Sequence, residues 1–294
     1  MQTKQQIQLL LASAGISPNK RLGQNFLIDL NLMRLLINSA DINNNDVVLE
    51  VGCGTGSLTK GLAEKAGAVI AAELDATLTR IAKSQLEKNK NVEVINTDIL
   101  EKKHFICPKI TTAVTTARKH LAGKFLLVAN LPYSVASPVM LNLITNKELI
   151  ADAMYVTVQK EVALRMAAAP CDKHYGTLSI LLSATGSVKT IRILKPAVFW
   201  PAPQVDSAMV SFVRSEEKIN QIQSMKLFTE VVTLFMQHRR KMLIACTKFA
   251  SENLKGIENW NKIFEQTFID PKKRPEQISP TDFLAIANTC RKNL

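Results

Sequence analysis

The feature that most constrains the fold is a strand followed by a glycine loop and a helix. Val47–Val51 is rich in β-branched residues and has the length of a buried strand. It leads directly into the loop 52–56, which reads Gly-Cys-Gly-Thr-Gly, and residues 57–66 then show apolar side chains at helical spacing. This order predicts a Rossmann-like α/β unit, in which glycines let a ligand approach the backbone and the helix N-terminus offers free N–H groups.

The glycine spacing and the next two strand ends predict a nucleoside pocket. The spacing is G-x-G-x-G, not the G-x-G-x-x-G of dinucleotide binders, so the ligand need not carry a pyrophosphate. Glu73 ends a predicted strand, where a carboxylate can accept both hydroxyls of a ribose. Asp98 follows the predicted strand 92–96 and can accept a hydrogen bond from an adenine amino group. Either acid alone is more often a turn or cap residue, but together with the glycine loop they favour S-adenosylmethionine.

Asn130-Leu131-Pro132-Tyr133 predicts chemistry on an exocyclic base amine. It follows the apolar run 125–129, which is typical of a strand covered on both faces. The Asn130 side-chain oxygen and the Leu131 carbonyl can accept the two N–H groups of such an amine, while Pro132 stiffens the turn. Tyr133 offers a face on which a flipped base can stack. Taken alone, these four residues fit equally well a strand that ends in a proline-containing turn.

Charge and composition predict a polyanionic partner. The 294-residue chain has a net charge of +12, which favours nucleic acid or an anionic membrane over a merely basic surface. Its five scattered cysteines include no C-x-x-C pair, so neither a disulfide framework nor a metal site is predicted, and a reducing cytoplasm fits. No apolar run approaches the length of a membrane span.

Strand patterning stops near Arg214, and a polar linker begins at Ser215. We therefore predict an α/β Rossmann-like domain at residues 1–214 and a small all-helical domain at residues 215–294. The second domain carries two basic runs, which are Arg239-Arg240-Lys241 and Lys272-Lys273-Arg274. A basic last turn also complements a helix dipole, but two such runs on one small domain favour contacts with RNA phosphates.

At this point the chain resembles a known family, the small-subunit ribosomal RNA adenine dimethyltransferases of the KsgA family, which are relatives of the erythromycin-resistance methyltransferases. The resemblance runs from about Lys20 to about Ser279. It is carried by motifs spread along the chain: Gly23-Gln24-Asn25-Phe26-Leu27, the segment 50–56, Glu73-Leu74-Asp75, Asn130-Leu131-Pro132-Tyr133, Gln159-Lys160-Glu161-Val162, Tyr175-Gly176, the segment 199–208, Arg239-Arg240-Lys241 and the segment 274–279.

The resemblance implies methyl transfer from S-adenosylmethionine to N6 of two adjacent adenosines in a 16S rRNA hairpin near the 3′ end, during 30S subunit biogenesis. The implied partner is the small ribosomal subunit, and the protein is expected to be a cytoplasmic monomer. The residues assigned are, for catalysis, Asn130, Leu131, Pro132, Tyr133 and Phe199; for the cofactor, Asn25, Leu27, Gly52, Gly54, Gly56, Glu73, Leu74, Asp98, Ile99 and Asn130; and for RNA, Lys20, Arg21, Arg239, Arg240, Lys241, Lys272, Lys273 and Arg274.

The chain departs from the family pattern at three places. Ser134 and Ala245 stand where the family usually has Asn, and the stretch 101–124 is longer than expected, which predicts an extra loop or helix near the cofactor. Alternatives to the small-subunit enzyme are a 23S rRNA methyltransferase of the erythromycin-resistance type and a non-catalytic ribosome-assembly factor. A methyltransferase that acts on DNA or a small molecule is disfavoured by the basic C-terminal region.

Overall fold

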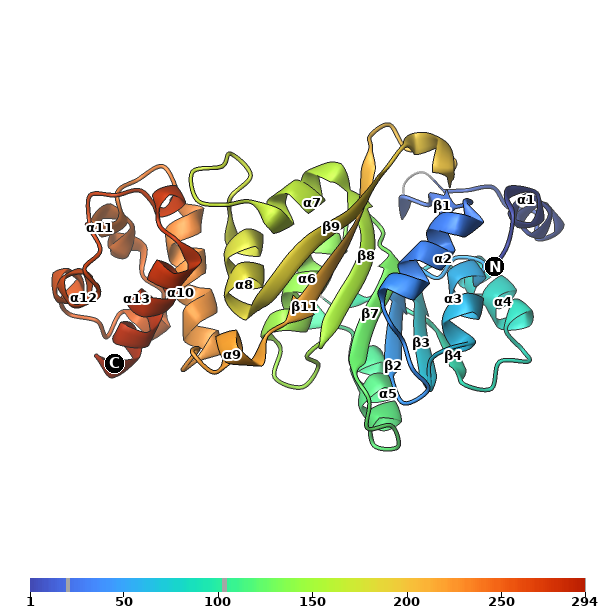
Figure 1. Ribbon diagram of the computed structural model, residues 1–294, viewed down its shortest axis with the longest axis horizontal. Coiled ribbons are helices and arrows are strands. Elements are labelled where there is room, and N and C mark those ends of the chain that lie inside the picture. Colours follow the sequence, from blue (N-terminus) through green and yellow to red (C-terminus); the bar gives the residue numbers. More distant parts are fainter. Residues whose placement is uncertain (20–21, 102–104, 294) are drawn as a thin grey trace. The chain divides into compact units, whose positions relative to one another are not determined.

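The computed structural model describes residues 1–19, 22–101 and 105–293 of the chain (Figure 1). Contacts within the chain divide it into two compact units. The sheet unit comprises Met1–Ala163 and Lys189–Val213, and the helical unit comprises Leu164–Val188 and Arg214–Leu294. Residues 164–188 thus make most of their contacts with the C-terminal helices. The predicted boundary between two domains at residue 214 stays a prediction.

The helices and strands follow the predicted α/β order and then a purely helical one. They are α1 (Lys4–Ser13), β1 (Phe26–Leu27), α2 (Leu30–Ser39), β2 (Val47–Val51), α3 (Ser57–Ala63), β3 (Ala68–Glu73), α4 (Ala76–Gln85), β4 (Val92–Asn96), β5 (Leu100–Glu101), β6 (Phe105–Ile106), α5 (Pro108–Arg118), β7 (Phe125–Asn130), α6 (Ala136–Thr145), β8 (Ala153–Gln159), α7 (Lys160–Ala167), α8 (Thr177–Thr185), β9 (Gly186–Leu194), β10 (Phe199–Trp200), β11 (Ser207–Arg214), α9 (Glu216–Ile219), α10 (Met225–Gln237), α11 (Leu243–Cys246), α12 (Trp260–Thr267) and α13 (Pro280–Lys292), with short 3-10 turns at Pro196–Val198, Thr247–Phe249, Glu252–Leu254 and Pro275–Gln277.

The main sheet has seven strands in the order β4-β3-β2-β7-β8-β11-β9. Strands β4, β3, β2, β7 and β8 pair in parallel, and β11 pairs antiparallel with β8. Strand β2 has its sequence successor β3 on one side and the much later β7 on the other, so the direction of winding reverses at β2. Open α/β sheets bind their ligands at such a switch point, outside the carboxyl ends of the strands.

The sheet is covered on both faces, as the apolar runs in its central strands predict. Every residue of β2 is buried, as are the first five residues of β7. Helices α2 and α3 pack over one face with apolar side chains such as Met33, Leu36 and Leu62 (Figure 1). On the other side, α5 buries Ile110 and Val114. Strand β6 and helix α5 therefore occupy most of the described part of the long stretch 101–124, and residues 102–104 lie outside the described residues.

In the helical unit, all elements after Ser215 are helical, as predicted. The apolar face of α10 is buried, and its Phe235 packs against Trp260, Phe264 and Phe283 with ring centroids 6.0–6.4 Å apart. Tyr175 is buried as well and donates a hydrogen bond to the Ile278 carbonyl at 2.9 Å. An aromatic cluster of this size gives the small unit a core of its own. Across the described residues of both units, we find no helix long and apolar enough to span a bilayer.

Candidate active site

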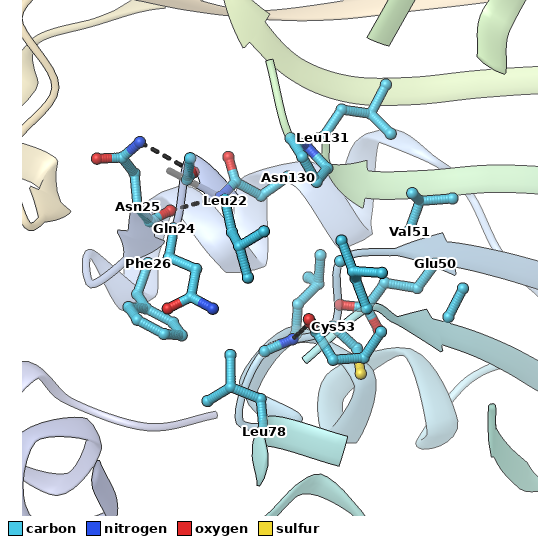
Figure 2. A pocket seen from close by; sticks show the side chains of 18 of the residues that line it. Leu22, Gln24, Asn25, Phe26, Glu50, Val51, Cys53, Leu78, Asn130 and Leu131 are labelled. Carbon is cyan, nitrogen blue, oxygen red and sulfur yellow. Dashed lines mark hydrogen bonds between the residues drawn. The ribbon is translucent and has the colours of Figure 1, made fainter. Parts of the chain in front are cut away.

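A cavity of about 230 Å³ opens at the carboxyl ends of β2, β3 and β7. One wall comes from residues 22–27 before α2, and the opposite wall from the glycine loop after β2 and from Leu78 on α4 (Figure 2). Asn130 and Leu131 close the cavity between these walls (Figure 2). The predicted strand ends therefore do meet at one edge of the sheet, all within the sheet unit.

Two glycines of the loop allow close contacts that a side chain would block. Gly52 has a φ of +77°, and a Cβ built on it would lie 2.8 Å from Pro132. Gly54 has a φ of +58°, and its Cβ would lie 2.9 Å from the Phe26 ring. Because these positions require both a left-handed backbone and no side chain, the glycine loop can lie directly against the Asn-Leu-Pro-Tyr turn and against β1.

The Glu73 carboxylate is already oriented by the backbone. It accepts hydrogen bonds from the Gly54 N–H at 2.8 Å and from the Asp75 N–H at 3.0 Å. The Glu73 side chain is 7% exposed, and this burial raises the pKa of the carboxyl, although the backbone N–H groups of Asp75 and Gly54 oppose the rise. Glu73 thus links the glycine loop to the start of α4 and presents the remaining faces of its oxygens to the cavity.

Glu50 is a second acid in the cavity wall, and it lies deeper. It is 2% exposed, and its Oε2 has no hydrogen-bond partner among the described residues. Burial raises the pKa of Glu50 to about 8, and the Glu73 carboxylate adds to the effect. Since an ionised carboxylate is costly in the interior, burial favours the protonated form of Glu50.

The amide of Asn130 is held so that its oxygen can accept a hydrogen bond. Its Nδ2 donates to the Asn25 carbonyl at 2.9 Å (Figure 2), which leaves Oδ1 as the acceptor of a side chain that lines the cavity. The neighbouring Leu131 N–H donates to the Thr157 carbonyl on β8 at 3.1 Å. The turn after β7 is therefore attached to both the residue 22–27 segment and the next strand.

Tyr133 lines the cavity mouth, and a hydrogen bond positions its ring. The hydroxyl groups of Tyr133 and Ser207 lie 2.8 Å apart, and Ser207 is buried at the start of β11. Burial also raises the pKa of the Tyr133 phenol. The ring is only half-buried, so part of it remains available for stacking.

Most of the predicted cofactor and catalytic residues line this one cavity. They are Asn25, Leu27, Gly52, Gly54, Glu73, Leu74, Asp98, Ile99, Asn130, Leu131, Pro132 and Tyr133. Two described residues, Gly56 and Phe199, lie outside the lining. Gly56 instead is the N-cap of α3, with a φ of +81°. Phe199 is 3% exposed and pairs with Leu27 between β10 and β1, so its ring packs in the core in this structure.

The six described residues predicted to contact RNA are all exposed residues of the helical unit, and they differ in their surroundings. Arg239 Nη1 lies 3.4 Å from the carbonyls of Lys173 and Tyr175, and its Nε lies 3.8 Å from a Glu276 oxygen. Lys241 instead places its Nζ 5.7 Å from the centroid of the Phe249 ring. Lys20 and Arg21 lie outside the described residues.

Two residues to which the sequence analysis assigned no role also hold the segments around the cavity. Gln2 donates from its backbone N–H to Ser57 Oγ at 2.7 Å and from Nε2 to the Thr55 carbonyl at 3.2 Å, and it accepts a bond from the Thr55 hydroxyl. Gln24 donates to Asp75 Oδ2 at 3.3 Å. Gln24 belongs to a quoted motif and could have been assigned, whereas no local signal connects Gln2 with the glycine loop.

Residues 15–292 match the sequence profile of the family described as Ribosomal RNA adenine dimethylase. The chain belongs to this family. Proteins named Ribosomal RNA small subunit methyltransferase A, from Geobacillus sp. (strain WCH70) and Clostridium perfringens (strain SM101), are 33% and 38% identical to it. These matches cover 95% and 93% of this chain and 94% and 91% of the relatives. The resemblance to this family that was read from the sequence motifs is thus confirmed.

Solved structures agree with this assignment. A dimethyladenosine transferase from Plasmodium falciparum superposes with a TM-score of 0.71 at 25% identity, covering 91% of this chain and 98% of the other. A 23S rRNA methyltransferase, ErmE, superposes with a TM-score of 0.62 at 18% identity, covering 90% and 99%, and shows the shared fold alone. The predicted fold, a Rossmann-like methyltransferase sheet with a helical C-terminal region, is confirmed for this dimethylase.

Proposed function

We propose that this protein transfers methyl groups from S-adenosylmethionine to N6 of two adjacent adenosines in a 16S rRNA hairpin near the 3′ end of the small-subunit RNA. The observation that carries the proposal is the Asn130 amide, which is fixed by its bond to the Asn25 carbonyl and lines a cavity between the glycine loop and the Asn25 segment. The reaction would take place in the cytoplasm during 30S subunit biogenesis, and the protein would act as a monomer.

The lining of the cavity fits S-adenosylmethionine. Glu73 would accept the ribose hydroxyls, and Asp98 the adenine amino group. Asn25, Leu27, Leu74 and Ile99 would complete the contacts, while the glycine loop would allow close approach of the backbone. Glu50 Oε2, which has no partner among the described residues, adds a buried polar atom at the same wall. The cofactor supplies an electrophilic methyl group on a sulfonium.

The residues of this chain would position the amine without a strong base. The N6 lone pair of adenine is conjugated into the ring, so the nitrogen is a weak nucleophile. If Asn130 Oδ1 and the Leu131 carbonyl accept its two N–H groups, they favour a tetrahedral nitrogen whose lone pair can attack the methyl carbon. The bond from that carbon to sulfur would break, the sulfur would leave as a neutral thioether, and the methylated nitrogen would then lose one proton to solvent. Tyr133 would hold the flipped base by stacking. Alignment and electrostatics of this kind can supply most of the acceleration.

The direct test uses labelled cofactor with separate small and large ribosomal subunits that lack the modification. Label is expected in N6,N6-dimethyladenosine of the small subunit. Label in the large subunit alone would instead support an enzyme of the erythromycin-resistance type, and label in neither would support a non-catalytic assembly factor.

A second test separates catalysis from docking. Tyr133→Ala removes a stacking face worth about 1–3 kcal/mol per base, or roughly 5–150-fold. If the base stacks on Tyr133 only when it reacts, the loss should appear in single-turnover methylation while subunit binding stays nearly unchanged. Tyr133→Phe keeps the ring and removes only the contact with Ser207, so it should retain most activity. Binding that falls in step with activity would assign Tyr133 to docking or folding.

A further inference from the structure

Phe268 is an outlier in both exposure and backbone geometry. Its side chain is 97% exposed, and it ends α12 in the left-handed region, with φ +56° and ψ +31°. The following N–H, of Ile269, bonds back to the Phe264 carbonyl at 3.0 Å and closes the helix. Glycine or asparagine usually occupies such a position, since other side chains are strained there. A bulky apolar ring that is both strained and exposed suggests a function outside the fold.

The chain directly after Phe268 forms a basic turn. Lys272, Lys273 and Arg274 are all exposed, and Asp270 is the single acid between Phe268 and Arg274. Asp270 is used within the turn, where its carboxylate accepts a hydrogen bond from the Lys272 N–H at 2.9 Å and its backbone carbonyl accepts one from the Lys273 N–H at 3.1 Å. The turn therefore presents three cations from a backbone that is held in one conformation.

The second basic run of the helical unit lies beside this turn. The N–H groups of Leu243 and Ile244, at the start of α11, donate to the carbonyls of Lys273 and Pro271 at 2.8 and 3.1 Å. Arg240 and Lys241 precede that helix, and both are exposed. The half-exposed ring of Phe249 lies beside this run, where it stacks on the His238 ring with centroids 4.0 Å apart. Each basic run thus has an exposed aromatic residue near it.

We propose that Phe268, together with Phe249 and the cations of Arg240, Lys241, Lys272, Lys273 and Arg274, forms a surface that binds single-stranded RNA by stacking an unpaired base on the Phe268 ring. We refer to these seven residues as the basic–aromatic surface. Cations bind the phosphates of any nucleic acid, whereas an aromatic face selects unstacked bases, which occur in loops and single strands of RNA. This inference rests on the proposed function, since it names a further contact for the same RNA substrate.

The test compares two labelled oligoribonucleotides of equal length and charge, one intact and one with abasic positions. The full chain should bind the intact strand about fivefold or more tightly than the abasic one, as expected for one stacked base. Phe268→Gly should lose this preference, and Phe268→Trp, which keeps a stacking face, should retain it. Lys272→Gln should weaken the binding of both strands equally and reduce its salt dependence.

A measurement of stability makes the Phe268→Gly result decisive. Glycine relieves the left-handed strain, so the variant should melt at an equal or higher temperature while its binding of the intact RNA falls. If Phe268 were needed only for the fold, Phe268→Gly would lower the melting temperature and leave the binding of RNA unchanged. Leu9→Ala, which removes another exposed apolar side chain, should leave the preference unchanged.

The inference is overturned if Phe268→Gly binds the intact strand as tightly as the unaltered chain. It is also overturned if Phe268 is needed only for self-association in sedimentation experiments, because the ring would then contact a second copy. Binding is measured without cofactor and is independent of methyl transfer. A chain that binds RNA through Phe268 but does not methylate the small subunit would contradict the proposed function alone.

Discussion

The cavity of the sheet unit and the proposed basic–aromatic surface of the helical unit differ in how their polar and charged groups are held. In the cavity, the polar groups are held before any ligand arrives, since Glu73 is bonded to two backbone N–H groups and Asn130 to the Asn25 carbonyl. On the surface, side chains such as Lys272 and Arg274 are exposed and solvated. A preorganised cavity suits chemistry that depends on geometry, whereas solvated cations suit docking that depends on charge and salt.

The largest effect is expected from the cavity residue that would hold the reacting amine. Asn130→Ala removes the proposed N6 acceptor together with a cofactor contact, so single-turnover methylation should fall by about 10²–10³-fold, the usual loss for one group that stabilises a transition state. Small-subunit binding should change little. Asn142→Ala, on α6 outside the cavity lining, is the matched control. Retained activity in Asn130→Ala would refute the proposed mechanism.

The next effect concerns stability and sharpens the contrast between buried and exposed charge. Burial raises the pKa of Glu50 to about 8 from an ordinary value of about 4.5. The folded protein therefore keeps this proton between those pH values while the unfolded chain releases it. The stability that Glu50 contributes is complete below about pH 4.5 and is lost as the pH rises toward 8, by about 1.4 kcal/mol per pH unit at most.

Glu50→Gln cannot ionise and should remove this dependence. The measurement is the denaturant midpoint of both proteins at pH 5 and pH 7.5. The wild-type midpoint should fall relative to that of the variant at the higher pH. Glu93→Gln, at an exposed position on β4, serves as the control and should leave the pH dependence of the wild type unaltered. Parallel midpoints in wild type and Glu50→Gln would show that Glu50 ionises normally.

A smaller loss is expected at the proposed ribose site. Glu73→Ala should weaken binding of S-adenosylmethionine by about 1–3 kcal/mol, the cost of leaving buried hydroxyl groups unpaired. Titration calorimetry measures this change, and Glu93→Ala should bind as the wild type does. Unchanged affinity in Glu73→Ala would remove Glu73 from the proposed site.

The smallest single-residue effects are expected on the helical unit. Neutralising Arg240 and Lys241 should reduce the slope of log affinity against log salt by about one unit for each lost phosphate contact. Arg239→Gln should act differently, since its guanidinium approaches Tyr175, Lys173 and Glu276 within the unit. We expect lower thermal stability from Arg239→Gln and a smaller change in slope. Equal slope changes in all three variants would mean that Arg239 also contacts phosphate.

The local signals of the sequence were sufficient for the sheet and most of the cavity. Strands of β-branched residues, glycines at fixed spacing and polar residues at strand ends have causes that lie within a few residues. The predicted strands over residues 47–51 and 92–96 match β2 and β4, and Glu73, Asp98 and Asn130 line one cavity because parallel strands end at the same edge. The roles assigned to these side chains stay predictions.

Tertiary structure alone decided which of these residues are held, buried or exposed. Nothing near Gln2 in the sequence connects it with Thr55, and nothing near Phe199 indicates that its ring packs against Leu27 in the core. Burial likewise separates Glu50, whose pKa is raised, from the solvated carboxylates of the surface, and folding leaves Phe268 exposed with a left-handed backbone. These properties depend on residues that meet only when distant segments pack together, so local sequence patterns do not predict them.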